Sequence, residues 1–279
     1  MMALTPIKLG TEMPIPACGA APRDGGPLIV NGLKIETIEG GDGRPLLFLH
    51  PGIGLDPKAP VLDLLAAKAR LIAPSHPGFG QSDLAPAMTT VDDLSYFYLD
   101  LMDALELADA TVVGVGFGAW IAAAIAIKST ARIARLVLAN PVGIKVGDRE
   151  TRDIVDVFAT LDPDLNKLAY FDPSLGERDY KSLPAAEVAT VARNREALAR
   201  FAWQPYMHDP KLKSRLHRIR IPTLVLWGTH DRILSEGYGR AFCAAIPHAR
   251  FEPIEKAGHF PHIEQPQVFA DRVFAFAGA

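Results

Sequence analysis

The chain has 279 residues, of which 49% are hydrophobic and 22% charged, and this is the composition of an ordinary globular protein. The formal net charge is −3 without any basic cluster, so nucleic-acid binding has no electrostatic support. No run of eighteen apolar residues offers a membrane span, and two cysteines, Cys18 and Cys243, are too few for a disulfide framework, which favours a cytoplasmic protein.

Residues 1–27 form the first segment. They lack the basic and then apolar pattern of a signal peptide, and Pro6, Pro14, Pro16 and Pro22 interrupt them. Because proline has no N–H to donate, this spacing disfavours helix and sheet, and we expect an extended N-terminal arm.

The next segments alternate between strand and helix patterns. LIVNGLKIETIEGGDG (28–43) predicts a β-hairpin with an Asn-Gly turn, and PLLFLH (45–50) is an apolar run typical of a buried strand. VLDLLAAKA (61–69) predicts a helix, and RLIAP (70–74) predicts a strand that its proline ends.

A long amphipathic helix is predicted for TTVDDLSYFYLDLMDALEL (89–107), with Thr89 or Thr90 as its cap and acidic residues in its first turn. The β-branched run TVVGV (111–115) predicts the next strand, and FGAWIAAAIAIKS (117–129) predicts the helix that follows it.

Three more strands are predicted at RLVLANP (135–141), IPTLVLWG (221–228) and ARFEPIE (249–255), and a final helix at EQPQVFADRVFAFAG (264–278). Since strands alternate with helices along most of the chain, we expect an α/β fold with a mainly parallel central sheet and helices on both faces.

Residues 143–220 break this alternation because they contain no convincing strand. Their helical patterns are RETRDIVDVFAT (149–160), PDLNKLAYF (163–171) and PAAEVATVARNREALARFAW (184–203). A structureless loop of that length is uncommon inside a domain. We therefore expect a helical cap at 143–220, inserted into a core made of residues 28–142 and 221–279.

The glycine-rich corner VVGVGFGAW (112–120) joins a predicted strand to a predicted helix. Gly114, Gly116 and Ala119 satisfy the G-x-G-x-x-G/A pattern of a dinucleotide-phosphate loop. Gly114 and Gly118 satisfy instead the G-x-S-x-G pattern of a nucleophile elbow, with Gly116 where the serine would be.

Two observations disfavour the dinucleotide interpretation. Such a loop usually opens the first βαβ unit and is followed by an acidic residue roughly 20 positions later. Here several predicted strands precede the corner, and the next strand ends in Asn140. We therefore expect no cofactor, and no spacing of histidine, cysteine or carboxylate residues indicates a metal site.

Four motifs in order carry a family resemblance, and they are FLHPGIG (48–54), APSHPGFGQSD (73–83), VVGVGFGAW, and the pair LWGTHDRI (226–233) and AGHFPHIEQP (257–266). They resemble the motifs of the α/β-hydrolase fold superfamily, in particular the capped group of carboxylesterases, epoxide hydrolases and carbon–carbon bond hydrolases. The resemblance covers residues 28–279 and implies that fold with a helical cap insertion.

The resemblance implies a catalytic acid and base. Asp231 follows a strand by a short loop, where the family places its triad acid, and His259 lies in the Ala-Gly-His turn, where the family places its base. In such a pair the carboxylate fixes the imidazole tautomer and stabilises the imidazolium that forms. We expect these two side chains to be hydrogen-bonded.

The resemblance also implies an oxyanion hole, built partly from the loop FLHPGIG. The family usually has glycine after the histidine of this motif, but Pro51 stands here and has no N–H to donate. We therefore expect one donor at Gly52 or Ile53 and the second at Phe117, which follows the nucleophile position and opens a helix.

His76 and His262 lie on loops at the rim of the expected site and are candidates for ligand contact. The predicted cap is rich in aromatic residues, which suit an apolar ligand as well as ordinary packing, namely Phe158, Tyr170, Phe171, Phe201, Trp203 and Tyr206.

Three interpretations of Gly116 stay open. In the first, the chain is a hydrolase-like enzyme of the carboxylic ester or carbon–carbon bond class, in which His259 acts on water or on a small apolar carbonyl or ester-type molecule without a serine nucleophile. In the second, it is a catalytically inactive binding or sensor protein. In the third, it is a serine hydrolase whose nucleophile was replaced by engineering. We favour the first interpretation, since the acid, the base and the oxyanion corner are present. The expected partner is a small molecule.

Overall fold

The computed structural model describes residues 28–148 and 150–278. The arm predicted for residues 1–27, with Cys18, lies outside the described residues.

One seven-stranded sheet organises the fold, in the order β3-β5-β4-β6-β7-β8-β9. Only β3 runs antiparallel to its neighbour, and the other pairs are parallel, which confirms the mainly parallel α/β sheet. The strands are β3 Thr37–Gly40, β4 Pro45–Leu49, β5 Arg70–Pro74, β6 Ala110–Val115, β7 Ile133–Ala139, β8 Thr223–Gly228 and β9 Arg250–Ile254. The predicted hairpin also forms, as β1 Leu28–Val30 and β2 Leu33–Ile35.

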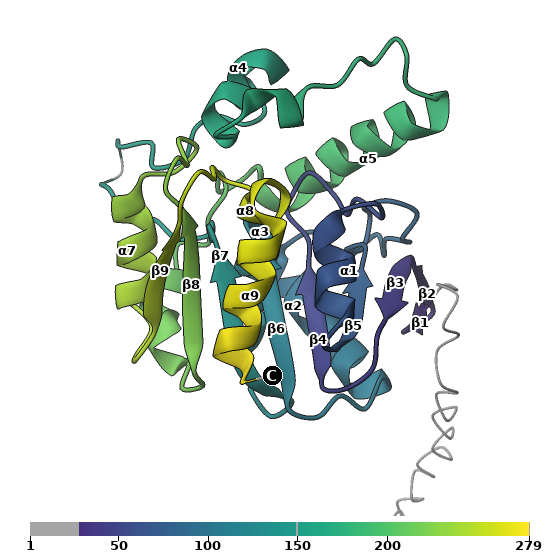
Figure 1. Ribbon diagram of the computed structural model, residues 1–279, viewed down its shortest axis with the longest axis vertical. Coiled ribbons are helices and arrows are strands. Elements are labelled where there is room, and N and C mark those ends of the chain that lie inside the picture. The colour runs from purple at the N-terminus through teal and green to yellow at the C-terminus, as the bar shows by residue number, and fades with distance from the viewer. Residues whose placement is uncertain (1–27, 149, 279) are drawn as a thin grey trace, which may run out of the picture.

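Helices cover both faces of the sheet, as Figure 1 shows. The α-helices are α1 Pro60–Ala66, α2 Val91–Ala104, α3 Phe117–Ala126, α4 Asp162–Ala169, α5 Ala185–Ala202, α6 Leu212–Arg215, α7 Glu236–Ala244, α8 Pro261–Glu264 and α9 Pro266–Ala277. Two short 3-10 helices are η1 Pro173–Gly176 and η2 Leu216–Arg218. Helix α2 begins with a capping box, in which the Thr90 hydroxyl accepts from the Asp93 N–H.

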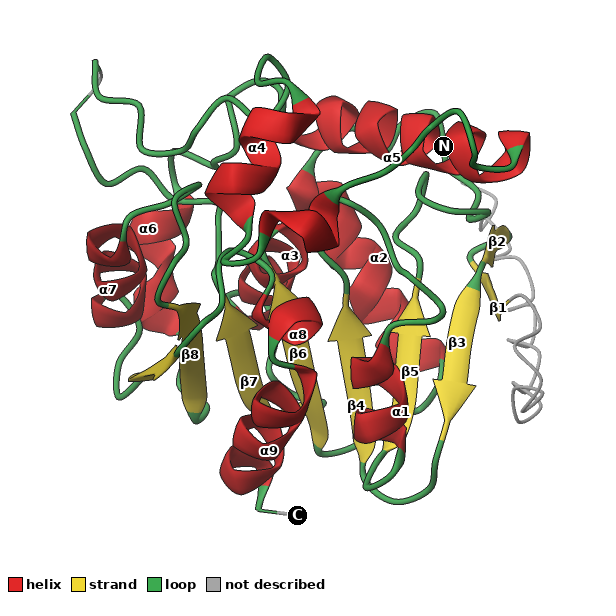
Figure 2. Ribbon diagram, turned by 45° about the horizontal axis from the view of Figure 1, so that its top comes forward, coloured by secondary structure: helices red, strands yellow, loops and turns green. Residues whose placement is uncertain are grey.

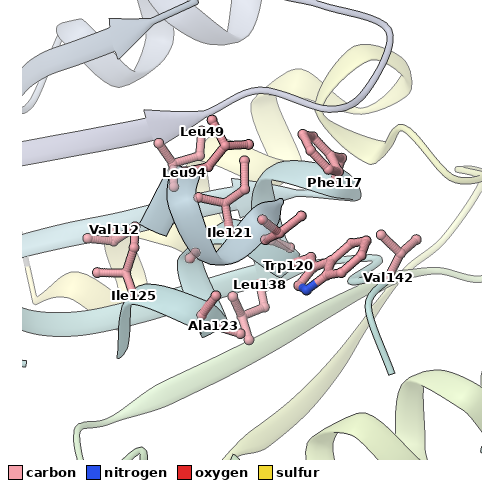
Figure 3. Close-up of a cluster of buried hydrophobic side chains, with 14 of the residues drawn as sticks. Leu49, Leu94, Val112, Phe117, Trp120, Ile121, Ala123, Ile125, Leu138 and Val142 are labelled. Atoms are coloured by element: carbon pink, nitrogen blue, oxygen red, sulfur yellow. The ribbon is translucent and has the colours of Figure 1, made fainter. Parts of the chain in front are cut away.

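The side chains of the central strands alternate between two hydrophobic cores. In β4, Leu46 and Phe48 pack with α1 and α9, whereas Leu47 and Leu49 pack with α2 and α3. Every residue of α3 is buried. Figure 3 shows its side chains packed among those of β4, β6 and β7. This packing fixes the first turn of α3 at the carboxyl edge of the sheet.

The segment at 143–220 lies across that edge. Figure 2 shows the parallel strands pointing toward α4 and α5, which lie over their carboxyl ends. The two connections to the rest of the chain run side by side, since Gly143 and His208 form a β-bridge and the Asp209 N–H donates to the Gly143 carbonyl. This arrangement agrees with an inserted cap, whose boundaries stay a prediction.

The helix predicted for residues 149–160 is wrong, because the described part of this stretch contains only turns and irregular chain. The Asp153 carboxylate accepts from the N–H groups of Val146 and Gly147, and the Asp156 carboxylate accepts from those of Phe158 and Ala159. Aspartate side chains that bond nearby N–H groups in this way compete with helical hydrogen bonds.

Within the described residues, no helix has the length and apolar character needed to cross a membrane. The cytoplasmic location stays a prediction.

Candidate active site

Gly116 lies between β6 and α3, at the sharp turn that the corner motif predicts. Its φ of 53° and ψ of −109° belong to a region that residues with side chains rarely adopt. The Gly116 N–H donates to the Ala139 carbonyl on β7, and its own carbonyl accepts from the Trp120 N–H in α3. The turn therefore keeps the strained conformation that an elbow imposes on its central residue, although glycine avoids most of its cost.

His259 and Asp231 meet at the carboxyl edge of the sheet, from the loops that follow β9 and β8. His259 Nδ1 lies 2.8 Å from Asp231 Oδ2, and the side chains are 9% and 0% exposed. The backbone N–H of His259 donates to the Ala169 carbonyl at the end of α4, which holds the turn in place. The hydrogen-bonded pair expected from the sequence is therefore present.

The Asp231 carboxylate has a complete set of partners. Its Oδ1 accepts from the N–H groups of Ile233 and Leu234 at 2.8 and 3.1 Å. Its Oδ2 accepts from His259 and from Asn140 Nδ2, the latter at 2.7 Å. A carboxylate held in this way stays oriented toward the imidazole.

Asn140 is a site residue that the sequence analysis missed. It follows β7 with a positive φ of 42° and is fully buried. Its Oδ1 accepts from the Gly228 N–H while its Nδ2 donates to Asp231, so it ties the loop after β8 to the end of β7. The only signal in the sequence is its place at the end of the strand next to the elbow strand.

The tautomer of His259 follows from these contacts. Because a carboxylate oxygen accepts from Nδ1, the neutral form of the ring carries its proton on Nδ1 and keeps a lone pair on Nε2. A Cβ built on Gly116 would lie 3.1 Å from that Nε2. The lone pair of the histidine therefore faces the site of the absent side chain, where it can take a proton from a bound molecule.

A cavity of about 130 Å³ opens beside His259. Gly52, Ile53 and Phe117, the predicted oxyanion residues, line it together with His259. Most of the remaining lining residues are apolar, including Val142, Val157, Phe158, Leu165, Leu198 and Met207. Of the six aromatic residues expected in the cap, Phe158 and Tyr170 line the cavity.

The loop that carries Gly52 and Ile53 is anchored by Asn194 of α5. Asn194 Nδ2 donates to the Ile53 carbonyl at 3.1 Å, and its Oδ1 accepts from the Gly80 N–H at 2.9 Å. Gly54, in the same loop, has a φ of 102° and lies so close to Asn194 that a Cβ there would overlap its amide. Asn194 is the second functional candidate that sequence reasoning missed.

His50 and His76 form a buried pair beneath that loop, with ring centroids 3.7 Å apart. The backbone N–H of His76 donates to His50 Nε2. His50 therefore carries its proton on Nδ1 and donates it to the Pro51 carbonyl. His76 Nε2 donates to the His50 carbonyl, and its Nδ1 accepts from the Tyr98 hydroxyl. Burial lowers the pKa of His50 to about 4 and that of His76 well below its usual value, so both rings are neutral.

The expectation that His76 and His262 contact a ligand at the rim is wrong for this structure. Neither lines the cavity beside His259, because His76 is held in the buried network and His262 lies on α8. His262 packs against Phe48, Phe260 and Phe269, and its Nδ1 has no partner in the described structure. Burial lowers the pKa of His262 to about 3.

Within residues 28–148 and 150–278, no group of three or more histidine, cysteine or carboxylate side chains is placed to hold a metal ion.

Comparisons with known proteins identify the family of the chain. Residues 46–272 match the Alpha/beta hydrolase family. The 2-hydroxymuconate semialdehyde hydrolase of Pseudomonas sp. (strain CF600) is 28% identical, over 92% of this chain and 94% of that protein. The 3-oxoadipate enol-lactonase 1 of Acinetobacter baylyi is 25% identical, over 83% of this chain and 88% of that protein.

A solved structure shows the same fold. It is a meta-cleavage product hydrolase from Pseudomonas fluorescens IP01, with a TM-score of 0.72 and 22% identity, over 91% of this chain and 97% of that chain. The family match covers most of the chain and agrees with the mainly parallel sheet flanked by helices. The chain therefore belongs to the alpha/beta hydrolase family.

Proposed function

We propose that this protein binds a small, largely apolar carbonyl or ester-type molecule and acts on it through His259 as a general base. In this proposal Gly116 stands at the nucleophile position, so no covalent intermediate forms. The observation that supports it most directly is the contact of His259 Nδ1 with Asp231 at 2.8 Å, which leaves Nε2 facing the cavity.

The proposed steps follow from the groups around the cavity. The ligand carbonyl lies between the N–H of Phe117 and that of Gly52 or Ile53, since all three residues line the cavity. There the N–H groups stabilise negative charge on the oxygen. His259 Nε2 removes a proton from the carbon next to the carbonyl or from a water molecule, and Asp231 stabilises the imidazolium that results.

Rate considerations favour proton transfer over ordinary ester hydrolysis. Removing a triad serine costs about a millionfold in turnover in a well-studied protease. General base catalysis alone supplies about 10²- to 10⁴-fold. A reaction that needs only proton transfer and carbonyl polarisation therefore loses much less from the glycine at 116.

The relatives support a carbonyl compound as the ligand. The two similar proteins are named a semialdehyde hydrolase and an enol-lactonase. A semialdehyde and a lactone each have a carbonyl group. We carry over only this functional group, because the identities are 28% and 25%.

Hydrogen–deuterium exchange next to a carbonyl tests the proposal. Methyl 6-oxoheptanoate is incubated with the protein in D₂O, and NMR follows the loss of signal from the protons beside the ketone. We expect exchange about 10²-fold or more above the rate without protein. We also expect His259→Ala to abolish this gain, with His217→Ala as the control for an exposed histidine.

A second candidate is a catalytically inactive binding protein, which the missing hydroxyl at Gly116 favours. In that case the ketone binds in the cavity but exchanges no faster than in buffer. Exchange that is equally fast in the wild-type protein and in His259→Ala would contradict the role of His259.

A further inference from the structure

A second cavity is separate from the one beside His259. Its volume is about 400 Å³, and its lining comes from the start of α2, from the α3 segment and from residues 204–215. None of its lining residues lines the cavity beside His259. The proposed function therefore does not account for it.

Five buried apolar side chains belong to the lining of this second cavity. They are Val91, Trp120, Ala124, Ile127 and Phe201, and each is at most 8% exposed. Because side chains packed in this way have fixed positions, this part of the lining is preformed. A ligand in contact with these residues needs an apolar part.

Trp120 is held in one orientation by contacts on two sides. Its ring meets the ring of Phe117 edge to face, with centroids 6.0 Å apart. A Cβ built on Gly143 would lie 2.4 Å from Trp120 Cγ, so the backbone of Gly143 packs directly on the indole. The indole N–H therefore has a defined direction.

The indole N–H of Trp120 is a hydrogen-bond donor without an acceptor. The residue is 3% exposed, and no residue among 28–148 and 150–278 accepts from its Nε1. In that part of the chain, His262 Nδ1 is the one side-chain nitrogen or oxygen that is both fully enclosed and without a partner. Trp120 Nε1 is therefore not fully enclosed, and it borders the space that Trp120 lines. Since buried N–H groups usually have acceptors, this donor indicates a bound group that accepts from it.

The charged side chains of the lining mostly compensate one another. Lys128 Nζ lies 2.6 Å from Asp92 Oδ1, and Arg215 Nη1 lies 3.9 Å from Asp209 Oδ2. Lys211 is exposed, so solvent screens its charge. A charged group on a ligand gains little here, and the lining favours a neutral molecule.

We infer that this cavity is a second binding site, for a small neutral molecule with an apolar body and a carbonyl-type oxygen that accepts from Trp120 Nε1. The inference does not rest on the proposed function, because the two cavities share no lining residue.

Two compounds of nearly the same shape test this site. Acetophenone has a phenyl ring and a carbonyl oxygen, whereas α-methylstyrene has a CH₂ group in place of that oxygen. Each is titrated into the ¹⁵N-labelled wild-type protein, and NMR follows the indole N–H signals of the three tryptophans. With acetophenone we expect a saturable shift of the Trp120 signal and a nuclear Overhauser effect between its indole proton and the ligand. We expect α-methylstyrene to bind about fivefold more weakly or worse, as for one lost hydrogen bond.

Three variants complete the test, with ligand binding followed through the ligand signals. Trp120→Phe keeps an aromatic ring but has no N–H, so we expect it to lose the preference for acetophenone. Trp203→Phe is the matched control, because Trp203 is exposed and lines neither cavity, and we expect it to keep the preference. Acetophenone also suits the cavity beside His259, so His259→Ala is included, and we expect it to keep the shift of the Trp120 signal.

The inference is overturned if the Trp120 signal shows no saturable shift or no Overhauser effect with acetophenone, since the N–H then meets only water. It is also overturned if α-methylstyrene binds as tightly in the wild-type protein, or if the shift is lost in His259→Ala. None of these outcomes bears on proton exchange at His259, so the proposed function stands or falls separately.

Discussion

Asn140 shows how one amide can set the geometry of a charged pair. It donates to the Asp231 carboxylate and accepts from the Gly228 N–H, and it is fully buried. The carboxylate thereby keeps one oxygen for Asn140 and His259 together, so the imidazole is held in the plane that points Nε2 at Gly116. A change in the orientation of the imidazole would therefore move Nε2 relative to Gly116.

We predict that Asn140→Ala lowers the free energy of unfolding by about 1–3 kcal/mol, because a buried N–H and a buried carboxylate oxygen each lose a partner. Urea denaturation measures this change. As a control, Gln267→Ala removes an exposed contact with Asp271 and should stay within about 0.5 kcal/mol of the wild-type protein. An Asn140→Ala protein as stable as wild type would show that the amide is not needed to hold Asp231.

At the scale of elements, helix α5 is tied to the loops beneath it through side chains that donate to backbone carbonyls. Arg193 donates to the carbonyls of Gly78 and Ser82, and Arg200 donates to those of Pro86 and Met88. Asn194 lies among these contacts and bonds the loop that lines the cavity at Ile53. The position of the candidate oxyanion loop therefore depends on α5.

We predict that Asn194→Ala loosens residues 52–54 and costs about 1–3 kcal/mol of stability, because both polar groups of a buried amide are removed. Hydrogen–deuterium exchange should show faster exchange in this loop than in the wild-type protein. Thr190→Ala on the same helix removes only a contact with the Ala186 carbonyl and should leave the loop unchanged. Equal protection in Asn194→Ala would mean that other contacts hold the loop.

Most of the sheet and its helices could be predicted from the sequence because their signals are local. The buried run of β4, the capping box of α2 and the alternation of strands with helices all lie within short windows. The pairing of Asp231 with His259 was expected from two motifs, and the structure brings them together.

The anchoring amides could not be predicted in the same way. Asn194 and Ile53 are 141 residues apart, so their contact depends on how α5 packs over the loop after β4. The segment at 149–160 has a helical pattern, yet its aspartates bond the nearby backbone instead. His262 was expected on a loop, but its ring is buried among aromatic side chains on α8.

At the scale of the whole molecule, three buried neutral histidines tie folding to pH. Burial lowers the pKa of His50 to about 4, that of His262 to about 3, and that of His76 well below its usual value. In the unfolded chain these rings bind protons near their ordinary pKa of about 6.5. Their contribution to stability is therefore complete above that pH and is lost as the pH falls toward the folded values.

We predict that stability falls below about pH 6.5, by roughly 1.4 kcal/mol per pH unit for each of the three histidines. Urea denaturation between pH 7 and pH 5 measures the slope. His262→Leu should reduce this slope by roughly 1.4 kcal/mol per pH unit, the contribution of one histidine. His217→Leu, at an exposed position, should leave the slope unchanged. A slope that is the same in His262→Leu and in the wild-type protein would contradict a neutral His262 in the folded state.

The central proposal is that Gly116 occupies a nucleophile position, where a hydroxymethyl side chain would lie beside His259. A Cβ on Gly116 would lie 3.1 Å from His259 Nε2, so a serine requires the ring to shift by a few tenths of an ångström. Its backbone would stay at a φ of 53°, which costs a residue with a side chain about 1–3 kcal/mol. We therefore expect Gly116→Ser to fold and to gain modest activity.

The most direct measurement assays the wild-type protein and Gly116→Ser with a short-chain nitrophenyl ester and a fluorophosphonate probe. We predict no ester turnover and no covalent labelling in the wild-type protein, and both in Gly116→Ser. Adding His259→Ala to Gly116→Ser should abolish both, because the serine then has no base to take its proton. Covalent labelling of the wild-type protein, or a folded Gly116→Ser variant that stays inert, would contradict the claim.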